Sequence, residues 1–273
     1  MPRVTRNTWR FFDTGARSGA FNMGLDLALM EEMHESPETA LPSLRLYAWA
    51  PPCVSLGYHQ RAEEIDFDRV HRAGFDLTRR PTGGRAVLHF EELTYSVVVP
   101  ADVFGGPTTV IESYRILSDG LVRGLTRMGI DAMLAPGVRS EKQAGSPACF
   151  AAVALCDLVS SGRKIVGSAQ VRRKGVILQH GSIPLIDREE TERVALMGEG
   201  APPISGMTCL TEAAGRPIGY AEAAGAVREG FIEAFGLDLV ETQVSPDLEE
   251  AAATLGAECD PLRAAASDRP PAV

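Results

Sequence analysis

The stretch RRPTGGRAVLH, residues Arg79–His89, sets a glycine pair and three arginines between two predicted strands. Glycine lets the backbone approach a ligand closely and adopts positive φ at little cost. Backbone N–H groups combined with arginine side chains suit an anion such as a phosphate or a carboxylate. A plain tight turn with solvated arginines is the alternative. The stretch is neither a P-loop nor a dinucleotide fingerprint, because it lacks both Gly-Lys-Ser/Thr and the spacing G-x-G-x-x-G.

Strands and helices follow one another in mixed order on both sides of this stretch. Strand-like runs between turn residues predict strands at Trp9–Asp13, Leu44–Ala50, Cys53–Tyr58, Phe75–Arg79, Ala86–His89, Leu93–Val99, Ala148–Val159, Lys164–Arg172, Val176–Pro184 and Leu237–Thr242. Helical patterns cover Ala20–His34, Phe67–Ala73, Thr109–Met128, Arg188–Met197, Ala221–Phe235 and Asp247–Leu255. This mixed order predicts an α+β fold of mixed β-sheets packed with helices.

Length and composition bound the domain organisation. The 273 residues fit one large domain or two small ones, and no internal repeat or long linker divides them. We therefore expect a single domain over residues 1–245, followed by a short helix and a loose tail over 246–273.

Charge and hydropathy exclude several kinds of protein. The chain has 27 basic and 36 acidic residues and a formal net charge of -9, which argues against nucleic-acid binding as its main task. No run of about 18 apolar residues is present, so no membrane span is expected. Because Met1–Trp9 is polar and lacks the apolar core of a signal peptide, a cytoplasmic location is expected.

Cysteine and histidine usage predicts no metal site and no cofactor. The five cysteines are odd in number and widely spaced, as expected of free thiols in a reducing compartment. Neither C-x-x-C nor H-E-x-x-H occurs, which argues against a structural zinc site and a zincin. His89 and His180 are interpreted as structural residues or as supports behind the site.

Two further residues are candidates for chemistry. Lys164 stands in a strand-like run with Ile-Val-Gly beside it, so partial burial would demand a partner for its ammonium. The alternative is an edge-strand lysine that discourages aggregation. Cys149 lies in the apolar stretch Pro147–Ala151, where a thiol is either a small core residue or a nucleophile. Cys156 has an equally apolar context, so the residues alone do not separate the two.

Taken together, these segments resemble the lipoate–protein ligase and octanoyltransferase superfamily. The similar motifs, in order, are Asn22-Met23, Ser55–Tyr58, RRPTGGRAVLH (Arg79–His89), ELTYS (Glu92–Ser96), ACF (Ala148–Phe150), RKIVGSAQ (Arg163–Gln170) and LQHGSI (Leu178–Ile183). Within the superfamily the chain is most similar to the Gram-positive-type octanoyltransferases. The resemblance implies a catalytic domain of the lipoate and biotin protein ligase type. It also implies transfer of octanoyl from octanoyl-acyl carrier protein to a lysine of a lipoyl-domain protein or glycine cleavage H protein, by a monomer.

The resemblance also implies roles for individual residues. It makes Cys149 the acyl acceptor and Lys164 the cation that lowers the pKa of its thiol. It places substrate contacts at Arg79, Arg80, Gly83, Gly84, Arg85, Ala86, Val87, His89, Gly167, Ser168 and Ala169. In this scheme Gly83-Gly84 and Ala86–Leu88 would line the acyl channel, and the three arginines would meet the phosphopantetheine phosphate or the acidic carrier protein surface.

Three alternatives stay open at this point. An ATP-dependent lipoate ligase would activate lipoate with ATP, although Arg85 and Cys149 fit such ligases less well. An amidotransferase that moves lipoyl groups between proteins would also use a cysteine thioester. A silent acyl-binding module is the non-enzyme alternative. Phe90 and the stretch Val153–Leu158 depart from the family pattern.

Overall fold

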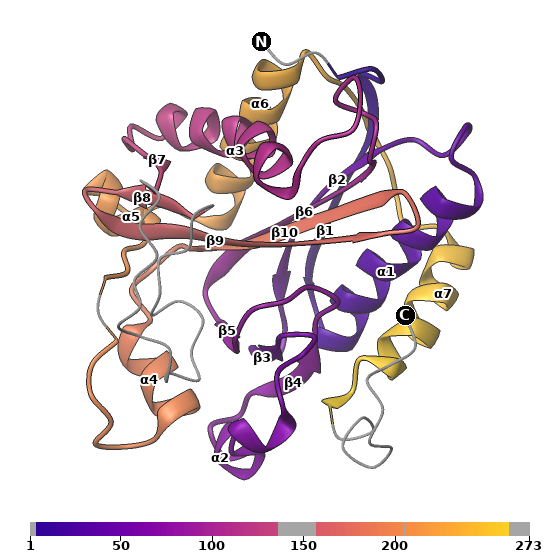
Figure 1. Ribbon diagram of the computed structural model, residues 1–273. Coiled ribbons are helices and arrows are strands. Elements are labelled where there is room, and N and C mark those ends of the chain that lie inside the picture. Colours follow the sequence, from indigo (N-terminus) through magenta and orange to yellow (C-terminus); the bar gives the residue numbers. More distant parts are fainter. Residues whose placement is uncertain (1–3, 136–156, 205, 262–273) are drawn as a thin grey trace.

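An eight-stranded mixed sheet forms the centre of the molecule (Figure 1). The computed structural model describes residues 4–135, 157–204 and 206–261. In spatial order the strands are β11 (Asp238–Glu241), β1 (Thr8–Arg17), β2 (Ser43–Trp49), β6 (Glu92–Pro100), β10 (Val176–Pro184), β9 (Arg163–Arg173), β8 (Leu158–Ser160) and β7 (Met133–Leu134). β1 is parallel to β2 and β11, whereas β6, β10 and β9 form an antiparallel block.

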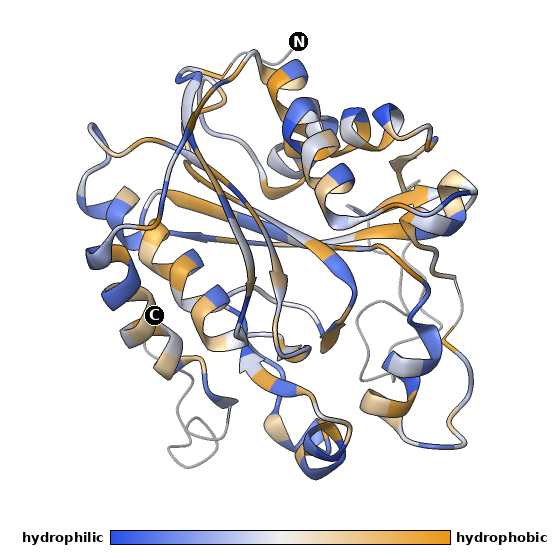
Figure 2. Ribbon diagram, turned by 180° about the vertical axis from the view of Figure 1, so that it is seen from behind, coloured by the Kyte–Doolittle hydropathy of each residue, from blue (hydrophilic) through white to orange (hydrophobic). Residues whose placement is uncertain are grey.

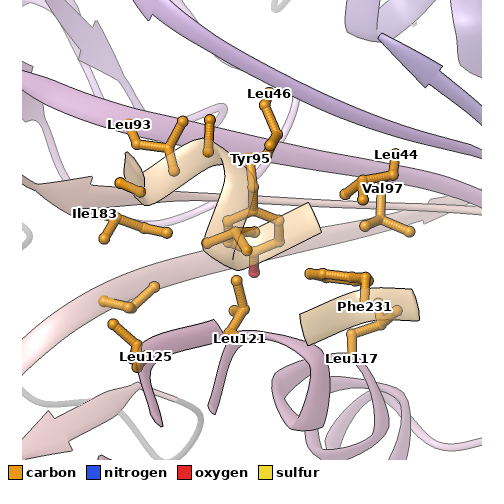
Figure 3. Close-up of a cluster of buried hydrophobic side chains, with 14 of the residues drawn as sticks. Leu44, Leu46, Leu93, Tyr95, Val97, Leu117, Leu121, Leu125, Ile183 and Phe231 are labelled. Carbon is orange, nitrogen blue, oxygen red and sulfur yellow. The ribbon is translucent and has the colours of Figure 1, made fainter. Parts of the chain in front are cut away.

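Helices cover both faces of this sheet. α3 (Val110–Arg127) and α6 (Tyr220–Phe235) lie on one face, and α1 (Gly19–Glu35) lies on the other with α7 (Pro246–Glu258) on its outer side. β6 shows how strand alternation divides the core, because successive side chains point to opposite faces. Leu93, Tyr95 and Val97 pack toward α3 and α6 (Figure 3). Val98 packs among the α1 residues instead.

A three-stranded sheet stands beside the main one and carries the glycine pair. Its order is β4 (Asp76–Arg79), β3 (Cys53–Leu56) and β5 (Val87–His89). The short 3-10 turn η1 (Ala62–Glu64) and the helix α2 (Phe67–Arg72) lie between β3 and β4 in the chain, and α4 (Glu189–Met197) packs on β5. Residues 80–86, the glycine segment, join β4 to β5, and a hydrogen bond between Thr82 and His180 on β10 links the segment to the main sheet.

The C-terminal helix α7 packs directly on α1, which lies between α7 and the sheet (Figure 1 and Figure 2). A Cβ atom added at Gly24 would lie 1.9 Å from the carbonyl oxygen of Ala252. Just after α7, the carbonyl of Cys259 accepts a hydrogen bond of 2.7 Å from the Arg79 backbone. The division at residue 245 stays a prediction, and residues 262–273 lie outside the described part.

The predicted α+β architecture is confirmed, and the differences are local. β1 runs on to Arg17 because a bulge between Asp13 and Gly15, where Gly15 has φ +58°, lets the polar end of the strand pair with β2. The short α5 (Leu210–Ala214) and the two-residue β7 were not predicted. In the described ranges, no helix is both long and apolar enough to cross a membrane.

Candidate active site

A pocket of about 440 Å³ lies between the glycine segment and strands β9 and β10. The predicted site residues that line it are Arg80, Gly83, Gly84, Arg85, Val87, His89, Lys164, Gly167, Ser168 and Ala169. The apolar part of the lining comes from Met23 on α1, Tyr47 and Trp49 on β2, and Tyr114 on α3. Residues far apart in sequence thus form one cavity that is apolar over much of its wall.

Trp49 is fixed on two sides in this wall. Its ring stacks on the imidazole of His89, with centroids 3.9 Å apart and an interplanar angle of 11°. Its indole N–H donates a hydrogen bond of 2.8 Å to Oγ1 of Thr94. Trp49 therefore presents a rigid apolar surface to the pocket.

Lys164 and Asp157 form a buried ion pair in the pocket wall. The Nζ atom of Lys164 lies 2.8 Å from Oδ2 of Asp157, and both side chains are 2% exposed. Because β9 lies between β8 and β10, Lys164 is not on an edge strand, and that alternative is wrong. The backbone of Lys164 is fixed as well, by hydrogen bonds with Gly206 and Thr208.

The glycine segment approaches the small sheet closely. Gly84 has φ +98°, a conformation that favours glycine. A Cβ atom added at Gly57 would lie 1.9 Å from the carbonyl oxygen of Gly84, so only glycine at position 57 permits this approach. The guanidinium of Arg80 donates hydrogen bonds of 2.8 Å and 2.7 Å to the carbonyls of Gly83 and Arg85.

The three arginines of the segment have different environments. Arg79 is 6% exposed and donates to the carbonyls of Gly57, Tyr58 and Gln60, outside the pocket lining. Arg80 is 5% exposed, and its bonds hold the segment. Neither side chain forms an open docking patch. Arg85 is half-buried and lines the pocket.

Strand alternation also divides the predicted acyl-channel residues. Val87 and His89 face the pocket. Ala86 and Leu88 point the other way, into the small-sheet cluster with Val54. Of the predicted channel residues, Gly83, Gly84 and Val87 line the cavity, whereas Ala86 and Leu88 do not, because successive residues of a strand face opposite sides.

Glu92 is the centre of a buried charge cluster behind the pocket. Its carboxylate accepts hydrogen bonds from Arg188, Ser182, Thr94 at 2.6 Å and His89 at 2.7 Å. Burial opposes ionisation, but the charges and hydrogen bonds of His89 and Arg188 outweigh it and lower the pKa of Glu92 to about 2. Burial lowers the pKa of His89 despite the opposing charge of Glu92, so the imidazole is neutral near pH 7.

A second buried carboxylate, Asp26 on α1, is paired with Arg45 at 2.9 Å. Its other oxygen lies 3.1 Å from Nδ1 of His180 and 3.3 Å from the hydroxyl of Tyr47. Burial raises the pKa of Asp26, but the His180 hydrogen bond and the Arg45 charge more than offset this and lower it overall. His180 lines the pocket, so a second charged group supports its wall from behind.

Sequence reasoning missed several of these residues. Asp157, Asp26, Arg45 and Trp49 lie outside the quoted motifs, and only long-range pairing reveals them. Glu92 carried a usable signal, because a carboxylate at the head of the apolar strand ELTYSVVV demands buried partners. Cys149 and Cys156 lie outside the described residues. Within the described ranges no His, Cys, Asp and Glu cluster could hold a metal ion.

The fold and this pocket define a catalytic domain of the lipoyl protein ligase kind. Residues 18–232 match the family model of the lipoyl protein ligase A/B catalytic domain, and the chain belongs to that family. Among its relatives, the octanoyltransferase LipM of Kyrpidia tusciae is 42% identical over 92% of this chain and 96% of that protein. The octanoyltransferase LipM of Bacillus subtilis is 47% identical over 68% of each. The chain is therefore an acyltransferase.

Solved structures share the fold. A lipoate-protein ligase A bound with ATP has a TM-score of 0.74 at 24% identity and covers 92% of this chain and 94% of its own. A bipartite lipoate protein ligase from an archaeal lipoylation system of Thermoplasma acidophilum has a TM-score of 0.73 at 23% identity and covers 92% of this chain and 93% of its own. At these identities the two structures show that the chain shares their fold.

Proposed function

We propose that the protein transfers octanoyl from octanoyl-acyl carrier protein, through a thioester on Cys149, to a lysine of a lipoyl-accepting protein. The acceptor is a lipoyl-domain protein or glycine cleavage H protein, and the enzyme works as a monomer without a cofactor. The LipM relatives support octanoyl transfer as the reaction type. The donor, the intermediate and the acceptor are the parts that experiment must test.

One observation carries the proposal. The backbone of Ala135, which precedes Cys149 in the sequence, donates a hydrogen bond of 2.9 Å to the carbonyl of Asp157, which follows it. Asp157 in turn pairs with Lys164 in the pocket wall. Two described residues on either side of Cys149 in the sequence therefore lie close to a buried cation and an apolar cavity. This supports the proposal because thioester exchange needs a cation near the thiol.

The first step is an exchange of thioesters. The Cys149 thiolate attacks the carbonyl carbon, a new C–S bond forms, and the bond to the pantetheine sulfur breaks. The departing pantetheine thiolate takes up the proton that the Cys149 thiol released when it ionised. A free cysteine has a pKa near 8.5, and an adjacent cation favours the thiolate. Lys164 supplies that cation, held by Asp157. The exchange is nearly balanced in energy, so no ATP is consumed.

The second step makes the amide. The neutral amine of the acceptor lysine attacks the Cys149 thioester, the C–N bond forms, and Cys149 departs as a thiolate. The amine loses one proton, which protonates the thiolate. Dividing the transfer in this way replaces one difficult step by two easier ones.

The apolar wall accounts for the acyl group. Burial of an eight-carbon chain stabilises the complex by about 5 kcal/mol at about 0.8 kcal/mol per CH₂. Met23, Tyr47, Trp49 and Val87 supply the apolar contacts. Arg85 is the residue we assign to the donor's phosphate.

Intact-protein mass spectrometry tests the thioester route. The enzyme is mixed with octanoyl-acyl carrier protein without ATP, as wild type, Cys149→Ser and the matched control Cys156→Ser. We expect one octanoyl adduct, labile to hydroxylamine, in the wild type and in Cys156→Ser but not in Cys149→Ser. Loss of the adduct in Cys156→Ser alone would move the nucleophile to that residue.

The acceptor step is tested with apo lipoyl domain added to the isolated adduct. Transfer of the octanoyl mass to the domain, and its absence when the target lysine is replaced by arginine, is the expected result. If no adduct forms and modification of the domain requires lipoate with ATP, the protein is a ligase and the proposal fails.

A further inference from the structure

Two histidines in the pocket wall each link a buried carboxylate to a buried hydroxyl. His180 lies between Asp26 and Thr82, with Nδ1 at 3.1 Å from the carboxylate and Nε2 at 2.7 Å from the hydroxyl. His89 lies between Glu92 and Ser55, at 2.7 Å and 2.8 Å. Both hydroxyl groups belong to the frame of the glycine segment and not to the pocket lining.

The direction of the His180 hydrogen bonds follows from the charge of Asp26. An ionised carboxylate only accepts hydrogen bonds, so Nδ1 of His180 donates to it. The other ring nitrogen, Nε2, shares the hydrogen bond with the Thr82 hydroxyl, so the ring joins Asp26 to Thr82. At His89, Glu92 likewise fixes Nδ1 as the donor, and because the lowered pKa leaves this ring neutral near pH 7, Nε2 accepts from Ser55.

The Asp26–His180–Thr82 and Glu92–His89–Ser55 chains of hydrogen bonds both hold the glycine segment. Thr82 directly precedes the glycine pair, and its carbonyl accepts a hydrogen bond of 2.9 Å from the Tyr58 backbone. Ser55 Oγ accepts a hydrogen bond of 3.1 Å from Arg80, whose other donors bind the carbonyls of Gly83 and Arg85. The backbone of the glycine pair is therefore held in part by two hydroxyl groups, those of Thr82 and Ser55, that do not line the pocket.

The Thr82 hydroxyl is held at an unusual energetic cost. Thr82, His180, Asp26 and Arg45 are at most 6% exposed, so two charges and two polar groups are withdrawn from water around it. Apolar residues of similar volume would fill such a space with equal or greater stability. A fully satisfied polar network instead fixes one geometry, which is what a wall against a flexible acyl chain needs.

We propose that Thr82, oriented by His180 and Asp26, is a positioning residue for acyl transfer. It fixes the backbone of Gly83 and Gly84 against the acyl chain and thereby sets both the transfer rate and the preference for chain length. This inference rests on the proposed octanoyl transfer. It assigns Thr82 no contact with the reacting atoms.

The neighbouring strand offers a matched control. Thr78 on β4 is 1% exposed, and its hydroxyl has no hydrogen-bond partner. Thr78→Val and Thr82→Val thus make the same chemical change in buried positions four residues apart in sequence. Only the second removes a hydrogen bond to a pocket histidine.

The experiment compares wild type, Thr82→Val, Thr82→Ser and Thr78→Val. Initial rates are measured with octanoyl- and dodecanoyl-acyl carrier protein, and amide hydrogen exchange is measured over residues 83–86. We expect kcat/KM for octanoyl to fall about tenfold or more in Thr82→Val, because misplacement by about 1 Å can cost up to 100-fold. Discrimination against dodecanoyl falls too, and exchange in the segment rises. Thr82→Ser and Thr78→Val keep wild-type values.

Several results would overturn the inference. Unchanged rate, selectivity and exchange in Thr82→Val would do so, as would a loss of activity in Thr82→Ser as large as that in Thr82→Val. Should Thr82→Val fail to fold, Thr82→Ala replaces it, because it removes the same hydrogen bond without an added methyl group. Amide exchange over residues 83–86 must then rise in Thr82→Ala. If the wild type transfers no octanoyl, the proposed function fails, whereas the exchange measurement still decides whether Thr82 fixes the segment.

Discussion

The ammonium of Lys164 and the carboxylate of Asp157 lie 2.8 Å apart and are equally hidden from solvent, each with a 2% exposed side chain. Their main-chain positions are on neighbouring parts of the sheet, since Asp157 directly precedes β8 and Lys164 lies on β9. A buried pair of this kind is costly to break on one side, because the remaining charge is left without compensation. The pair therefore couples the stability of the fold to the chemistry of the pocket.

Replacing Lys164 alone should lower the stability of the fold and abolish acylation. We expect Lys164→Met to lower the free energy of unfolding by about 3–5 kcal/mol, because the buried Asp157 carboxylate loses the cation that faces it. The double variant Lys164→Met with Asp157→Asn should recover much of this stability and none of the acylation rate. Urea unfolding and adduct formation measure the two effects separately. Recovery of activity in the double variant would show that Lys164 has no chemical role.

Glu192 makes stability depend on pH between about 4.5 and 7. It is fully buried on α4, neither carboxylate oxygen has a hydrogen bond, and Arg188 Nε lies 3.6 Å away. Burial, opposed by Arg188, raises the pKa of Glu192 from 4.5 to about 7. The folded state therefore binds more protons than the unfolded state between these values, and stability falls as pH rises from about 4.5 to 7.

Glu192→Gln removes this dependence. At about 1.4 kcal/mol per pH unit, the variant should match the wild type near pH 4 and exceed its stability by about 3 kcal/mol at pH 8. Glu190→Gln on the same helix is the control, because the Glu190 side chain is 76% exposed and pairs with Arg193. Chemical unfolding at pH 4, 6 and 8 measures the difference. Parallel profiles for wild type and Glu192→Gln would contradict the assignment.

Gly57 decides whether the glycine segment can lie where it does. A Cβ atom at position 57 would meet the Gly84 carbonyl at 1.9 Å, whereas one at Gly83 would meet nothing within 4 Å. Gly57→Ala should therefore lower the free energy of unfolding by about 1–3 kcal/mol, the usual cost of overpacking. Gly83→Ala should leave the unfolding midpoint nearly unchanged. Thermal unfolding of both variants checks this, and equal midpoints would mean that the segment shifts freely.

The sequence predicted most elements and much of the pocket because these depend on local pattern. Lys164 stood out because its neighbours are small and apolar, and Gly83-Gly84 because a strand cannot continue through them. Ala86 was assigned to the channel because the motif covers consecutive residues. In a strand, however, every second side chain points away from the pocket, and Ala86 is one of these. The His180–Asp26 contact spans 154 positions, and no periodicity in the chain links these two residues.

The packing of α7 on α1 provides a test of whether the C-terminal helix belongs to the domain. Gly24 and Gly225 are both helical glycines, yet a Cβ at Gly24 would lie 1.9 Å from the Ala252 carbonyl on α7, and one at Gly225 meets nothing within 4 Å. Alanine is favoured over glycine in a helix by about 0.5–1 kcal/mol. Gly225→Ala should therefore raise the free energy of unfolding by up to that amount.

Gly24→Ala should instead lower the free energy of unfolding by about 1–3 kcal/mol, because α7 must move away from α1. Such movement also strains the hydrogen bond from the Arg79 backbone to the Cys259 carbonyl, which ties the end of α7 to the start of the glycine segment. Loss of stability together with faster amide exchange at Arg79 would place α7 in the same cooperative unit as the pocket. A stabilised Gly24→Ala variant would show that α7 rests on α1 loosely and that the domain ends near residue 245.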